Sequence, residues 1–179
     1  MDTTSMSLLE RLQLPNAQES WGRLVKLFTP LLYDCARRVG LSSPDASDFV
    51  QDVLAVLVER MHEITKSQGT CYRSWLRTVT IDCWHRKRQG LKSEAPVDVP
   101  DSFNVFEETE YRQYLVRRAL ELMHSEFHPA TWKACWESVV VGRPAEEVAQ
   151  ELGMAINAVH LSKSRVLSRL HRELSGLLD

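Results

Sequence analysis

The chain has 179 residues, enough for one domain or two small ones, and its hydrophobic content of 44% is too high for a disordered tail. No apolar run approaches the roughly 20 residues that a membrane span needs, and the N-terminus lacks a signal-peptide pattern. We therefore expect a soluble, cytoplasmic protein without membrane insertion. The net charge of −2 alone argues against a nucleic-acid partner, but the charges are unevenly distributed.

Glycine and proline are few and strand-like alternation is absent, which predicts an all-α fold. The first helix is expected from about Glu19 to Val39, with an apolar stripe along one face and Gly40 at its end. Pro30 lies inside this stretch, so we expect it to kink or split the helix.

The second helix is expected to begin at Ser43-Pro44, a cap followed by proline at the first helical position, and to end near Met61. Its region, Ser42–Glu63, carries five acids and one base. The acidic side is either a solvated face or a docking face for a basic partner. The acidic side chains on it are Asp45, Asp48, Asp52 and Glu59.

A basic segment with aromatic residues follows. Six Lys or Arg and one Asp lie between Cys71 and Lys92. Four β-branched residues, Thr78 to Ile81, predict a local break in the helix. Aromatic rings beside cations suit single-stranded nucleic acid, whose bases stack on rings. Trp75 is expected in the core, whereas Trp84 is equally compatible with the core and with base stacking.

The pattern lapses from Gly90 to about Asn104, which predicts a linker. Helices are then expected from Val105 to Phe127 and from Pro129 to about Val141. The chain is thus predicted to form two small helical domains, residues 1–89 and 105–179, joined by a linker at 90–104.

The C-terminal stretch predicts two helices joined by a turn at Gly153, with Pro144 in the first turn. Apolar residues at helical spacing, from Val148 to Leu174, are expected to share one core. The opposite face of the second helix is polar and basic. This is the plan of a helix-turn-helix that reads a DNA major groove. The polar residues are Asn157, His160, Lys163, Ser164, Arg165 and Arg169.

The cysteines show no C-x-x-C pair and are expected to be reduced thiols. His124 and His128 are four residues apart, as some zinc ligands are, but lack supporting ligands. We expect no metal and no cofactor.

Nearly the whole chain resembles bacterial RNA polymerase sigma factors of the extracytoplasmic-function (ECF) subfamily. The first half is similar to their promoter-melting domain through Asp45-Ala-Ser-Asp-Phe-Val-Gln-Asp-Val-Leu and Trp75-Leu-Arg-Thr-Val-Thr. The second half is similar to their other DNA-binding domain through Glu147-Val-Ala-Gln-Glu-Leu-Gly and Asn157-Ala-Val.

The resemblance implies a non-enzymatic initiation factor whose partners are core RNA polymerase, at its clamp and flap regions, and promoter DNA. It also makes an anti-sigma protein a plausible partner. Polymerase docking would fall on Asp45, Asp48, Gln51 and Asp52. Reading and melting of the −10 element would fall on Thr80, Ile81, Asp82, Trp84, His85, Arg86, Lys87 and Arg88. The −35 duplex would be read by Asn157, Ala158, His160, Leu161, Lys163, Ser164 and Arg165.

Two alternatives remain open from the residues. A stand-alone helix-turn-helix regulator explains the second half but gives no role to the Trp75–Arg88 segment. A nucleic-acid enzyme that uses His85, Asp82 or the cysteines lacks a cluster with catalytic spacing.

Overall fold

The computed structural model describes residues 6–66, 71–90 and 98–178, and within these ranges all regular structure is helical. The predicted all-α fold is therefore confirmed. No helix in the described ranges is long and apolar enough to cross a membrane. The helices are α1 (Leu8–Arg11), α2 (Gln18–Arg38), α3 (Ser43–Lys66), α4 (Tyr72–Gly90), η2 (Asp101–Phe106), α5 (Glu108–Met123), η3 (His124–Glu126), α6 (Pro129–Val139), α7 (Ala145–Leu152) and α8 (Ile156–Glu173).

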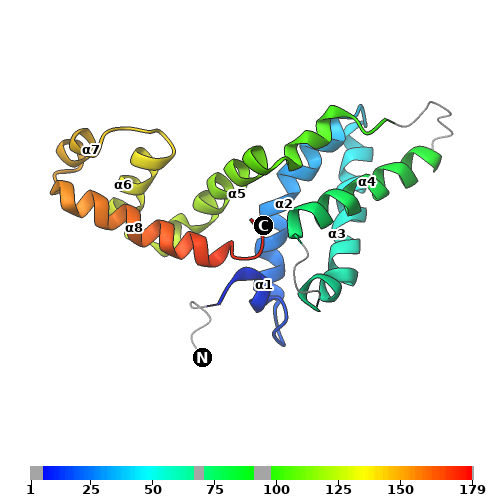
Figure 1. The fold of residues 1–179 in the computed structure, drawn as a ribbon, viewed down its shortest axis with the longest axis horizontal. Helices are drawn as coiled ribbons and strands as arrows, with labels where there is room; N and C mark the ends of the chain where they lie inside the picture. Colours follow the sequence, from blue (N-terminus) through cyan, green and yellow to red (C-terminus); the bar gives the residue numbers. More distant parts are fainter. Residues whose placement is uncertain (1–5, 67–70, 91–97, 179) are drawn as a thin grey trace.

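The molecule is elongated, with α5 in its middle (Figure 1). Helices α2, α3 and α4 lie on one side of α5, and helices α6, α7 and the N-terminal part of α8 lie on the other. Helix α5 packs against α2 and η2, so the main hydrophobic core extends across the middle of the chain.

Helix α1 was not expected from the sequence, although a recognisable signal precedes it. The Ser7 hydroxyl accepts a hydrogen bond from the Glu10 backbone, and the Glu10 carboxylate accepts one from the Ser7 backbone at 2.7 Å. This reciprocal arrangement is a capping box, which stabilises the start of a helix. Leu8 and Leu12 are buried and anchor the short helix on the core.

Helix α2 runs through Pro30 without being split. Proline has no N–H, so the carbonyl of Lys26, four residues earlier, lacks its usual helical donor. The Arg118 Nε atom on α5 donates to that carbonyl at 3.1 Å, and the Tyr114 hydroxyl donates to the next carbonyl, of Leu27, at 2.7 Å. The irregularity in α2 therefore serves as a docking point for α5.

Helix α3 begins at Ser43, the residue predicted as its cap, and continues to Lys66, beyond the expected end. The cap is one residue earlier than expected, because the Ser42 hydroxyl accepts the Asp45 backbone N–H at 3.2 Å.

The break predicted within the Thr78–Ile81 run is wrong, because α4 is continuous from Tyr72 to Gly90. Val79, Thr80 and Ile81 are buried, so packing outweighs their weak helix propensity. The Thr80 hydroxyl also donates to the Leu76 carbonyl at 2.7 Å.

The end of the expected linker is part of the packed structure. Phe103 and Phe106 in η2 are both buried, and the Phe103 ring lies 5.7 Å from that of Trp84. Residues 91–97 of the predicted linker lie outside the described residues.

The predicted single core for the last two helices is wrong in part. Val148 and Val159 belong to a small separate cluster with Ala134 and Ala149, whereas Val166, Leu170 and Leu174 belong to the main core. Ile156, which was expected to be inward, is 44% exposed because it begins the helix at the outer end of the small cluster.

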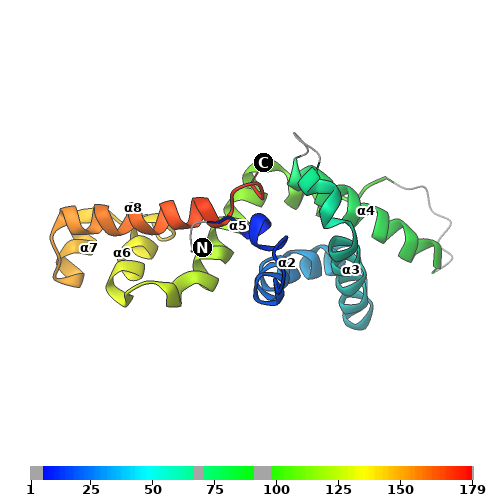
Figure 2. The ribbon, with the colours of Figure 1, turned by 90° about the horizontal axis from the view of Figure 1, so that it is seen from below.

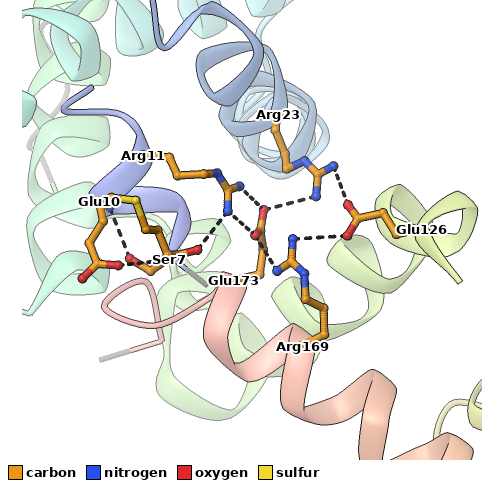
Figure 3. A network of polar contacts seen from close by, with 8 residues as sticks. Ser7, Glu10, Arg11, Arg23, Glu126, Arg169 and Glu173 are labelled. Atoms are coloured by element: carbon orange, nitrogen blue, oxygen red, sulfur yellow. Dashed lines mark hydrogen bonds and ion pairs between the residues drawn. The ribbon is translucent and has the colours of Figure 1, made fainter. Parts of the chain in front are cut away.

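A cluster of charges joins the C-terminal end of α8 to the N-terminal part of the chain (Figure 3). The buried Glu173 carboxylate accepts two hydrogen bonds from Arg11, at 2.7 and 2.8 Å, one from Arg23 at 3.2 Å and one from Arg169 at 2.9 Å. Glu126 pairs with both Arg23, at 2.7 Å, and Arg169, at 3.2 Å. Three arginines from α1, α2 and α8 thus share two glutamates from η3 and α8, and the buried Nε atom of Arg169 has no hydrogen-bond partner among the described residues.

Candidate nucleic-acid interface

The C-terminal half of α4 carries the basic segment, and several of its expected DNA-reading residues are buried. Thr80 is fully buried, Ile81 is buried, and Trp84 is only 4% exposed. Trp84 packs against Phe103 on one side, and the Arg88 guanidinium lies 4.9 Å from its ring centroid. The choice between core and base stacking that the sequence left open for Trp84 is therefore resolved towards the core in this conformation.

The remaining residues of the segment present a polar surface. Asp82 and Arg86 are exposed, while His85, Lys87 and Arg88 are half-exposed. Arg86 donates to the Cys83 sulfur at 3.2 Å and to the Asp82 carbonyl at 3.4 Å, which holds its guanidinium along the helix. The surface therefore combines one acid with several cations, and the buried Trp84 ring lies beneath them.

The acidic face of α3 adjoins this segment. Asp48, Gln51 and Asp52 are exposed, and Asp45 is half-exposed. The Asp45 carboxylate accepts a hydrogen bond from the Ser42 hydroxyl at 2.6 Å and pairs with Lys87 at 3.5 Å. The Ser42 hydrogen bond, with the Lys87 charge as a smaller cause, lowers the pKa of Asp45. Asp45 thus makes a direct ion pair with the basic segment.

Helix α8 exposes one continuous stripe at intervals of three and four residues. Leu161, at 58% exposed, lies in the middle of this stripe. Among the described residues, Lys163 and Arg165 form no ion pair or hydrogen bond, unlike Arg169 farther along the helix. The stripe consists of Asn157, His160, Leu161, Ser164, Arg165 and Ser168, with exposed Lys163 beside it and half-exposed Ala158 at its edge.

Helix α7 and its turn hold the start of α8. Gly153 ends α7 with a positive φ of 62°, and the Met154 backbone N–H donates to the Ala149 carbonyl at 3.0 Å. Arg143 pairs with Glu137 at 3.1 Å and also with Glu147 and Glu151, which ties α6 to α7. The Gly153 turn and the Arg143 ion pairs therefore stabilise the position of the N-terminal part of α8, which carries the exposed stripe.

The two surfaces lie at opposite ends of the long axis of the molecule. Figures 1 and 2 both show the C-terminal end of α4 at one extreme and the N-terminal end of α8 at the other. The helices between them, α2 and α5, share the main core. The expected DNA-contacting residues are thus separated into two groups and not gathered in one site.

No group of three or more potential metal ligands occurs in the described ranges. His128 caps α6 by accepting the Ala130 backbone N–H, and His124 bonds the Glu121 carbonyl at 2.9 Å. The four cysteines are free thiols, and burial raises the pKa of Cys35 to about 12 and that of Cys135 to about 11. At neutral pH these two thiols are protonated, which makes them poor nucleophiles.

Comparison with known proteins does not assign the chain to a group: no family model matches it, and no curated protein matches it significantly.

The ion-pair cluster around Glu173 is not predicted from the sequence. Glu173 lies on the face of α8 that otherwise carries inward apolar residues, such as Leu170 and Leu174. An acid at such a position indicates a buried ion pair. Its arginine partners on α1 and α2 could not be identified from spacing, because Arg11 lies 162 residues away.

Proposed function

We propose that this protein is a sigma-type initiation factor that joins core RNA polymerase and directs it to a promoter. The observation that carries the proposal is the pair of exposed polar surfaces, on α4 and on α8, at the two ends of one elongated molecule (Figure 1). Two separate contacts suit two separated promoter elements. The protein would act in the cytoplasm and without a catalytic step of its own.

In this proposal α8 reads duplex DNA at the −35 element. A helix that places side chains in a major groove needs an exposed, unpaired polar face near its N-terminus. Lys163 and Arg165 meet this requirement, since neither is neutralised by a described acid. Base edges would be read from the stripe between Asn157 and Ser164, with the cations on phosphates or bases.

The α4 segment would hold the −10 element. In this proposal DNA would contact the exposed residues Asp82 and Arg86 and the half-exposed residues His85 and Arg88. Asp82 can accept a hydrogen bond from an exocyclic amino group such as cytosine N4. The buried residues Thr80, Ile81 and Trp84 would support this surface from beneath, and they reach bases only if α4 moves.

Polymerase would dock on the neighbouring acidic face of α3. Asp48, Gln51 and Asp52 project into solvent, and acids on such a face favour a basic partner surface. Asp45 is partly occupied by Lys87, so we assign it a smaller share of the binding.

Reconstitution of the full chain with bacterial core RNA polymerase, followed by mapping of the transcripts that it starts, tests the proposal. We expect Arg165→Ala to reduce promoter-complex formation about tenfold while polymerase binding stays unchanged. The double change Asp48→Lys and Asp52→Lys should weaken polymerase binding first. Arg117→Ala and Glu110→Lys, two exposed positions on α5 outside both proposed surfaces, are the matched controls.

A stand-alone transcriptional regulator is the competing function. It is favoured by the small separate core of α6, α7 and α8, which supports the α8 stripe without help from α3 or α4. Tight, sequence-specific DNA binding by the protein alone, unaffected by polymerase, would establish this alternative and reject the sigma-type function.

A further inference from the structure

The exposed stripe of α8 contains one large apolar side chain. Leu161 is 58% exposed, the largest fraction among the exposed large hydrophobic residues in the described part of the chain. Its neighbours one turn away along the helix are Asn157, Ser164 and Arg165, all exposed and polar. The buried face of the same helix segment is formed by Val159, Ser162 and Val166, so Leu161 points away from the core.

The position of Leu161 suits contact with a base edge. It is the sixth residue of α8, and the N-terminal residues of a recognition helix are the ones that reach bases in a major groove. The cations that would hold DNA phosphates, Lys163 and Arg165, lie two and four residues after it and are unpaired among the described residues.

The major groove offers one prominent apolar group, the C5-methyl of thymine, alongside the donors and acceptors of the base edges. Removing an exposed leucine side chain from water is favourable where an apolar group covers it. The polar residues around Leu161 can form hydrogen bonds to neighbouring bases, but they cannot recognise the C5-methyl group of thymine, which forms no hydrogen bond.

We propose that Leu161 is a specificity-determining residue that selects thymine in the upstream promoter element by packing on its C5-methyl. This inference rests on the proposed function, because it assumes that α8 enters the major groove of a promoter. It adds the identity of one base, which neither the helix pattern nor the charge of α8 provides.

The experiment uses the full chain with core RNA polymerase at a promoter found by transcript mapping. Each thymine of the upstream element is replaced in turn by deoxyuridine, which removes the methyl and keeps every hydrogen-bonding group. At one position we expect complex formation to weaken about fourfold, the loss that corresponds to one buried methylene-sized group.

The protein-side arm repeats the series with Leu161→Ala, which should lose the difference between thymine and deoxyuridine at that position. Leu161→Met should retain it, because an apolar side chain of similar length remains. Val141→Ala, which truncates another residue that is 55% exposed, should leave the thymine preference unchanged.

The outcomes separate this inference from the proposed function. Failure to start any transcript with core polymerase rejects both. Promoter complexes that tolerate deoxyuridine at every upstream position overturn the role of Leu161 and leave the proposed function standing. Persistence of the deoxyuridine effect in Leu161→Ala also overturns it, because another side chain would then read the methyl.

Discussion

Glu173 shows how one buried side chain can connect distant parts of this molecule. Its side chain is 2% exposed, and three arginines surround the carboxylate. Burial alone would raise the pKa of Glu173, but hydrogen bonds from Arg11 and Arg169, aided by their charges, outweigh this and lower the pKa to about 2. The carboxylate is therefore ionised at any pH at which the protein is expected to function.

Replacement of Glu173 by glutamine should strongly destabilise the fold, because three arginines would lose their common anion. We expect the free energy of unfolding at neutral pH to fall by about 3 kcal/mol, measured by urea denaturation. Glu108→Gln, which removes an exposed partner of Arg112, should cost less than about 0.5 kcal/mol. Equal effects of the two changes would contradict the ion-pair assignment.

The wild-type protein and Glu173→Gln together test how the stability of the fold depends on pH. A carboxylate whose folded-state pKa is depressed contributes stability that is fully present above the unfolded value of 4.5 and is lost as pH falls towards about 2. Wild-type protein should therefore lose stability between those pH values more steeply than Glu173→Gln.

At the scale of the element, the packing of α5 on α2 depends on a defect in α2. Pro30 leaves the Lys26 carbonyl without a helical donor, and Arg118 supplies one. Sequence reading predicted the disturbance at Pro30 but treated it as a kink or a break. The compensating donor, Arg118, lies 92 positions after Lys26, a separation that no local pattern reveals.

A double-mutant cycle can measure this compensation. Arg118→Ala should reduce the free energy of unfolding by about 1 kcal/mol in the wild type. In a Pro30→Ala background, where the alanine N–H can bond the Lys26 carbonyl, the cost should fall by at least half. Arg117→Ala, on the exposed side of α5, should show no coupling to Pro30.

The turn before α8 provides a second test at the same scale. Gly153 has a φ of 62°, and no neighbouring atom lies within 4 Å of the place that a Cβ atom would take, so alanine there would meet backbone strain alone. We expect Gly153→Ala to destabilise the protein by about 1 kcal/mol in thermal or urea unfolding. Gly22→Ala, in open space within α2, should instead stabilise it by about 0.5 kcal/mol.

Most helices were predictable from the sequence because amphipathic stripes and caps are local. The errors arose where packing decides. The β-branched run of α4 stays helical because Val79, Thr80 and Ile81 are buried. Ile156 is exposed because the small core that α8 joins begins one turn later, at Val159. Among the candidate DNA residues, the sequence could indicate the basic segments but could not show that Thr80 and Trp84 face inward.

At the scale of the whole molecule, the shared core and the Glu173 cluster should keep the two end surfaces at one separation in the free protein. Spin labels at Gln89→Cys and Ser168→Cys, with half-exposed Cys71 replaced by serine, allow this separation to be measured. Double electron–electron resonance should give one narrow distance distribution in the wild type and a broader one with Arg11→Ala. A broad distribution without that change would show that the ends move independently.

The cluster in Figure 3 also constrains how the protein is made. Ribosomes deliver a chain from its N-terminus, so Arg11 emerges 162 residues before the glutamate that balances its charge. Until Glu173 arrives, Arg11 on α1 lacks its ion-pair partner, and Leu8 lacks Leu174, which lines the same small cavity. The first helix of the chain is therefore expected to be among the last to settle during synthesis.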